Sequence, residues 1–158
     1  MNTILTPTDV INSGLPISTD IRTEEIQFWI DTIETVYLRD ILGPVYQEII
    51  ETPADFTNIL NGSADTPSLK LGLLHAVYAY GIYEQVSSTR YHAVIKTSDE
   101  STVPDPKVLK NLSMHHYEIF LTICRRICEF LNIPTKGVHG CSMIFSELLW
   151  CGNNDHLL

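Results

Sequence analysis

The feature that most constrains the fold is a series of helix starts and stops between Thr6 and Ile50. Thr6 can cap a short helix, and a long amphipathic helix is predicted over residues 23–42. Gly43 and Pro44 end that helix, because glycine accepts a positive φ and proline disfavours helical geometry in the residue before it. A second short helix can begin at Pro44. Apolar residues recur at spacings of three and four along the long helix and form one stripe: Ile26, Trp29, Ile30, Ile33, Tyr37 and Ile41.

Two more long helices are predicted downstream, over residues 68–91 and 106–131. The first is apolar nearly all round, which is typical of a central helix, and its Gly72 and Gly81 would allow neighbours to approach closely. With 158 residues and 44% hydrophobic content, the chain is expected to be all-α, a small bundle of about four to six helices. Residues 52–66 predict a loop around one helical turn, and a small hairpin there is the alternative.

The expected core lies where the stripes of the three long helices face one another. It comprises Trp29, Ile33, Tyr37, Leu74, Val77, Tyr78, Leu112, Ile119 and Ile123.

We expect a helical domain over residues 1–131 and a C-terminal tail over residues 132–158. The tail has too many large apolar side chains for a free segment in water, so it should fold back on the domain or dock on a neighbour. The side chains predicted to bind a partner are Phe145, Leu148, Leu149 and Trp150.

Charge is distributed unevenly along the chain. Residues 1–66 contain 11 Asp or Glu and only two basic residues, Arg22 and Arg39, whereas residues 67–158 contain eight of each sign. A surface that grips nucleic acid needs clustered Lys and Arg, so the acidic half argues against DNA binding. It fits a protein partner, a surface past which DNA slides, or simply a solvated face.

No catalytic or cofactor motif is found: there is no phosphate-binding loop, no GxGxxG and no GxSxG. His116 lies in the apolar stripe of the third long helix and is expected to be a hydrogen-bonded core residue. Cys124 and Cys128 are expected to be buried thiols. A zinc site that adds His139 and Cys141 is the alternative, although its spacing matches no common zinc motif. We therefore predict no cofactor and no enzyme activity. The most apolar segment, residues 71–83, is shorter than the roughly 20 residues that span a bilayer, so no membrane association is expected.

Five features of the chain follow one another in a characteristic order. They are the short helix at Thr8–Asn12, the long helix with Tyr37-Leu38, the stop at Ile41-Leu42-Gly43 before Tyr46, the buried segment Leu69–Tyr91 and a second long helical segment, Lys107–Leu131. On these features, residues 4–131 resemble the small head–tail connector, or adaptor, proteins of tailed bacteriophages, particularly those of Bacteroidetes phages, including crAss-like phages.

The resemblance implies a structural subunit of a ring, typically of twelve copies, that lies between the portal and the neck or tail and extends the DNA channel. The implied partners are other copies of the chain, the portal protein and a neck or tail protein, at the head–tail junction of a virion assembled in the host cytoplasm. DNA would pass without specific binding. The alternative is a small helical regulatory module that binds another protein. In a ring, the acidic side chains expected to face the channel are Glu24, Asp31, Glu34, Asp40 and Glu48.

Overall fold

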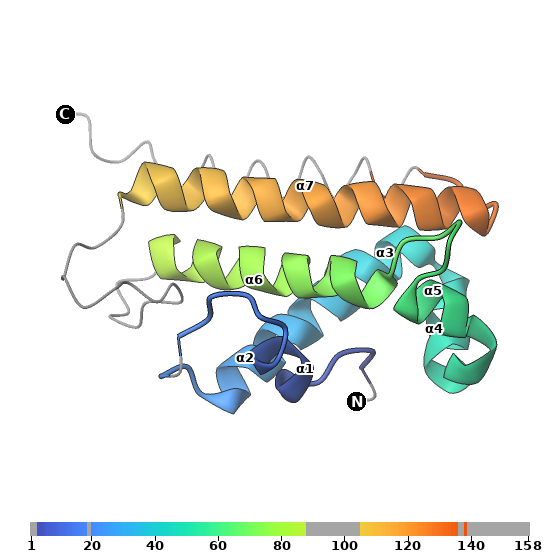
Figure 1. Ribbon diagram of the computed structural model, residues 1–158, viewed down its shortest axis with the longest axis horizontal. Coiled ribbons are helices and arrows are strands. Elements are labelled where there is room, and N and C mark those ends of the chain that lie inside the picture. The colour runs from blue at the N-terminus through green and yellow to red at the C-terminus, as the bar shows by residue number, and fades with distance from the viewer. Residues whose placement is uncertain (1–2, 19, 88–104, 136–137, 139–158) are drawn as a thin grey trace.

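The computed structural model describes residues 3–18, 20–87, 105–135 and 138, and within these ranges every regular element is a helix (Figure 1). The fold class is therefore all-α, as the sequence predicts. In chain order the elements are α1 (Pro7–Ile11), α2 (Thr23–Thr32), the π-helix η1 (Ile33–Leu38), α3 (Arg39–Leu42), α4 (Pro44–Glu51), the 3₁₀ helix η2 (Pro53–Phe56), α5 (Thr57–Asn61), α6 (Leu69–Ser87) and α7 (Pro106–Phe130).

Helix α1 begins with a complete capping box. The Thr6 hydroxyl accepts a hydrogen bond from the Asp9 backbone N–H at 3.3 Å, and the Asp9 carboxylate accepts one from the Thr6 backbone N–H at 2.8 Å. The Thr6 hydroxyl also donates to this carboxylate at 2.7 Å, and these bonds hold the pKa of Asp9 below its usual value. A five-residue helix is too short to be stable alone, so this cap and the burial of Val10 hold it in place.

The predicted long helix over residues 23–42 exists, but it is not uniform. It runs as α2, η1 and α3 without a break, and its middle six residues form a π-helix. The predicted stop is confirmed: Gly43 has φ of +56°, and α4 begins at Pro44.

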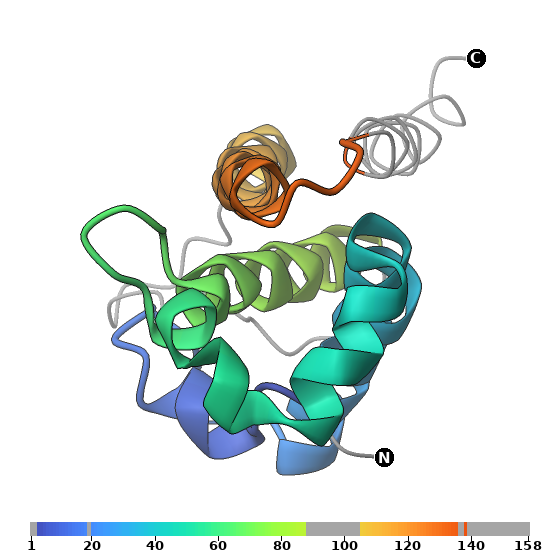
Figure 2. The ribbon, with the colours of Figure 1, turned by 90° about the vertical axis from the view of Figure 1, so that its right-hand side faces the viewer.

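Helix α6 is central. It packs against α7 on one side and against α1, α2, η1 and α5 on the other, and Figures 1 and 2 show it lying between these two groups. Two glycines allow this double contact. A Cβ atom at Gly72 would lie 3.0 Å from Ile123 of α7, and one at Gly81 would lie 2.9 Å from the Trp29 ring of α2. The predicted close approach at both positions is confirmed.

The predicted core is correct for six of its nine residues and wrong in register for three. In α6, Leu73 is fully buried, whereas the predicted Leu74 is only partly buried. Because α6 is apolar nearly all round, hydropathy could not tell these neighbours apart. Trp29, Ile33, Tyr37, Val77, Tyr78 and Ile123 are buried, whereas Leu74, Leu112 and Ile119 pack against the edge of the core.

The buried face of α7 is rotated relative to the predicted stripe. Ser113 and Phe120 are fully buried, whereas Phe130 is 57% exposed. The Ser113 hydroxyl donates a 2.8 Å hydrogen bond to the backbone carbonyl of Ala79 in α6, so a polar residue occupies the helix interface without an unsatisfied group.

Residues 52–66 contain helical turns, and the alternative of a hairpin there is wrong. The helices η2 and α5 follow each other directly, and α5 ends at Gly62, whose φ is +85°. The Ser68 hydroxyl then accepts a hydrogen bond from the Leu71 N–H and donates one to the Leu60 carbonyl, which joins α5 to the start of α6.

We predict that Leu73→Ala lowers the free energy of unfolding by about 2–5 kcal/mol, because the shortened side chain leaves a cavity at a fully buried position near the start of α6. Urea denaturation monitored by circular dichroism would measure the loss. The matched control is Leu71→Ala in the same helix, where the side chain is 49% exposed and the change should stay within roughly 0.5 kcal/mol. Equal losses for the two variants would contradict the orientation of α6.

Candidate functional site

A buried carboxylate links the N-terminal segment to the helical domain. Glu34 lies in η1 and is 0% exposed. One of its oxygens, Oε2, accepts a 2.8 Å hydrogen bond from the backbone N–H of Ile4, and the other, Oε1, accepts a 2.9 Å bond from that of Leu5. The Tyr46 hydroxyl of α4 lies 3.4 Å from Oε2 and donates to it. Three chain segments therefore meet at this one side chain.

Glu34 forms no ion pair with a cationic group among the described residues, so its charge is balanced only by hydrogen-bond donors. Burial raises its pKa from 4.5 to about 7, because removal from water penalises the charged form more than the bonds from Ile4, Leu5 and Tyr46 favour it. Burial, together with the neighbouring Glu34 charge, also raises the pKa of Tyr46 to about 12. The carboxyl therefore changes its charge near neutral pH.

This burial corrects the prediction that Glu34 faces a channel. The buried residues of the long helix come in adjacent pairs that repeat every four residues, a longer period than the 3.6 of an α-helix. A π-helix has more residues per turn, so η1 keeps these pairs on one face. The four-residue repeat was the signal in the sequence that could have placed Glu34 inside. The pairs are Trp29-Ile30, Ile33-Glu34, Tyr37-Leu38 and Ile41-Leu42.

The other four acidic side chains remain candidates for a channel surface. Glu24, Asp40 and Glu48 are exposed, and Asp31 is half-buried and accepts a 2.9 Å hydrogen bond from the Gln27 amide. Whether they face a channel stays a prediction.

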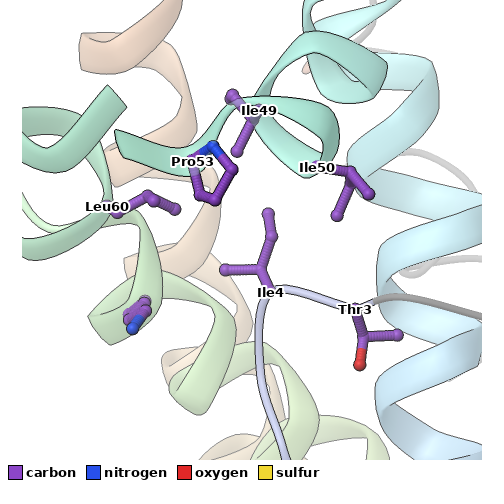
Figure 3. Close-up of a pocket in the computed structure, with 7 residues that line it drawn as sticks. Thr3, Ile4, Ile49, Ile50, Pro53 and Leu60 are labelled. Atoms are coloured by element: carbon purple, nitrogen blue, oxygen red, sulfur yellow. The ribbon is translucent and has the colours of Figure 1, made fainter. Parts of the chain in front are cut away.

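A small pocket lies beside the Glu34 link (Figure 3). Its volume is about 130 Å³, and the N-terminal segment, α4, η2, α5 and α6 all contribute to its lining. Figure 3 shows the Ile4 side chain pointing from the N-terminal segment toward α4. Since the backbone N–H of Ile4 is bound by Glu34, the buried carboxylate fixes one wall of this pocket. The lining residues are Thr3, Ile4, Ile49, Ile50, Pro53, Leu60 and Lys70.

A second polar contact joins α6 and α7. The Nδ1 atoms of His75 and His116 lie 2.7 Å apart, and the Tyr78 ring packs edge-on against His116 with centroids 4.8 Å apart. One ring must donate its Nδ1–H and the other must accept, so the pair holds together while both rings are neutral. Burial and the neighbouring rings lower the pKa of His116 to about 4, which keeps it neutral at neutral pH. The predicted hydrogen bond of His116 is thus confirmed, but the side chain is half-buried and lies outside the buried core.

The described residues contain no group of three or more His, Cys, Asp or Glu side chains arranged to hold a metal ion. Cys124 and Cys128 are buried in α7, as predicted, and burial together with the nearby Glu129 raises the pKa of the Cys128 thiol. His139 and Cys141, the remaining members of the alternative zinc site, lie outside the described residues.

The predicted partner-binding side chains also lie outside the described residues, and their docking role stays a prediction. These are Phe145, Leu148, Leu149 and Trp150.

No protein-family model, curated protein or solved structure matches this chain. Within the part of the chain that the structure describes, no helix has both the length and the apolar character needed to cross a membrane. The candidate site is therefore assigned from its geometry alone: the Glu34 link and the adjoining pocket.

We predict that the stability difference between the wild-type protein and Glu34→Gln depends on pH. With a folded-state pKa of about 7 against 4.5 when unfolded, the wild-type carboxyl contributes fully below pH 4.5, and this contribution is lost as pH rises through 7. Glutamine does not titrate and cannot accept both N–H bonds, so below pH 4.5 the variant is less stable than the wild type. The wild-type advantage should shrink by about 3 kcal/mol between pH 4.5 and 7.

Urea denaturation of both proteins at several pH values would measure this difference. Comparing the two proteins cancels other titrations, including those of His75 and His116, which destabilise the fold at low pH because their pKa values are lowered. Glu48→Gln is the matched control, since Glu48 is exposed on α4. A Glu34→Gln difference that is constant with pH would show that the carboxyl does not titrate as the geometry implies.

Proposed function

We propose that this chain is a structural subunit of a ring that connects the portal of a tailed bacteriophage to its neck or tail. The observation that carries the proposal is the order of the helices. A short capped helix, a long helix that stops at Gly43, a helix with Tyr46, and the long α6 and α7 follow one another as in the pattern on which the resemblance rests.

The surface of the N-terminal half also supports this proposal. Helix α2 carries exposed or half-buried carboxylates, yet Phe28 is 57% exposed, and Val36 in the adjoining η1 is 52% exposed. Large apolar side chains on an acidic helix suit a surface that another protein covers. The remaining carboxylates suit a channel rim, because an acidic wall does not retain DNA through counterion release.

The proposed partners are other copies of this chain in a ring, typically of twelve, together with a portal protein and a neck or tail protein. The proposed location is the head–tail junction of the virion, after synthesis in the host cytoplasm. The chain would act by packing and assembly, with no cofactor. The alternative function is a small helical regulatory module that binds another protein.

We predict a closed oligomer of many copies when the full chain is measured by native mass spectrometry, either alone or with a portal protein. A monomer or dimer under both conditions would contradict the ring and favour the regulatory module. The same preparation should not bind duplex DNA appreciably at about 0.15 M salt, because the acidic half opposes phosphate contacts. Micromolar or tighter binding would argue against a channel protein.

A further inference from the structure

The pocket beside Glu34 has the size and chemistry to hold one aromatic side chain. Its volume is about 130 Å³, and a protein cavity of about 150 Å³ lined by apolar residues takes up benzene. The walls are mostly aliphatic, and Lys70 supplies the one ionised group in the lining. An ammonium group that lies over an aromatic face attracts it, so this lining favours an aromatic ring over an aliphatic side chain.

Across the ranges that the structure describes, two exposed phenylalanines could fill such a pocket in another copy of the chain. Phe28 of α2 and Phe130 at the end of α7 are each 57% exposed. Large apolar side chains are also exposed at Ile11, Val36, Leu71 and Val108, but these lack an aromatic ring.

Charge distinguishes the two phenylalanines. One turn before Phe28 lies Glu24, which is exposed. The corresponding neighbour of Phe130 is Arg126, also exposed. Lys70 is half-buried and forms no ion pair with another described residue, although its charge is a minor cause of the lowered pKa of Asp9. A copy that presents Phe28 brings a carboxylate to Lys70, whereas one that presents Phe130 brings a second cation.

We propose that Phe28 of one copy of this chain inserts into the pocket formed by Thr3, Ile4, Ile50 and Lys70 of the next copy, with Glu24 facing Lys70. Glu24 then belongs to the subunit contact and not to the channel surface. The inference rests on the proposed ring and names its subunit contact. The pocket lining contains no residue of α2, so the inserted side chain and the pocket belong to different surfaces of one molecule. A contact between two different surfaces is head-to-tail, and it forms a ring when its repeated rotation closes.

The pocket wall links this contact to the buried carboxylate. The Ile4 backbone is held by Glu34 at 2.8 Å, and the Ile4 side chain lines the pocket. The receiving surface is therefore formed before a neighbour arrives, which reduces the ordering cost of association.

Photo-crosslinking tests the contact directly. The full chain is made with p-benzoylphenylalanine in place of Phe28, mixed with an isotopically labelled wild-type chain, and irradiated. We expect crosslinks between labelled and unlabelled chains at peptides that contain Ile4, Ile50 or Lys70. The photoreactive residue in place of Phe130 is the matched control and should give no crosslink to these peptides. Absence of crosslinks from position 28, or crosslinks only to other peptides, would overturn the proposal.

Paired variants test the head-to-tail geometry. Phe28→Asp removes the inserted side chain, and Thr3→Trp fills the pocket. Each variant alone should be monomeric in light scattering. Their mixture should form a dimer, because Phe28 of the Thr3→Trp variant can enter the open pocket of the Phe28→Asp variant. Melting temperatures close to that of the wild type would show that both variants fold, since Phe28 is exposed and Thr3 is only half-buried. Full assembly of either variant alone would overturn the proposal.

The outcomes separate this contact from the proposed function. If the chain forms a closed ring but position 28 does not crosslink to the pocket, the proposed connector function stands and the proposed contact is wrong. If position 28 crosslinks to the pocket but no closed ring forms, even with a portal protein, the contact stands and the proposed ring is wrong.

Discussion

Hydrogen bonds to the buried Glu34 carboxylate hold the N-terminal segment against the helical domain. The way the segments around this side chain pack depends on these bonds. Two backbone N–H groups, at Ile4 and Leu5, point at one carboxylate about thirty residues further along the chain. Without it both donors would lose their partner, and a buried unpaired donor such as the Leu5 N–H costs roughly 1–3 kcal/mol. The same carboxylate receives the Tyr46 hydroxyl, so the segment before α1, the π-helix and α4 are joined at one point. Burying this charge without a cation is unfavourable, and a carboxyl that is half protonated near pH 7 reduces that cost.

Features that depend on neighbouring residues were predictable from the sequence, whereas features that depend on distant partners were not. The Thr6 cap and the end of the long helix at Gly43 could be predicted because the groups involved lie within four residues of one another. The four-residue repeat marks the helix face on which Glu34 lies, but the donors that stabilise a buried carboxylate there come from residues 4 and 5, so its burial was missed. Ser113 was missed for a similar reason: its hydroxyl is satisfied by a carbonyl of α6, and hydropathy contains no sign of that bond. The pocket could not be predicted, since five separate elements line it.

The central position of α6 connects the packing to the proposed function. Gly72 and Gly81 let α7 and α2 approach opposite sides of this helix, so the three helices pack closely together. A rigid subunit with preformed surfaces suits assembly into a closed ring, because each contact must repeat with the same rotation. The polar groups between helices are then structural: His75 and His116 bind each other across α6 and α7, and Ser113 binds the α6 backbone. The outer surface, with its carboxylates and exposed Phe28, is where the proposed partners would bind.

The central claim is that Glu34 is a buried carboxyl that binds the backbone of residues 4 and 5. Its most direct test is a pH titration by NMR of the full chain, with ¹³C detection of the Glu34 side-chain carboxyl and ¹⁵N detection of the Ile4 and Leu5 amides. The account predicts a carboxyl midpoint of about 7, with both amide signals shifting along the same curve. A midpoint near the ordinary 4.5, with amide signals that do not follow it, would contradict the account.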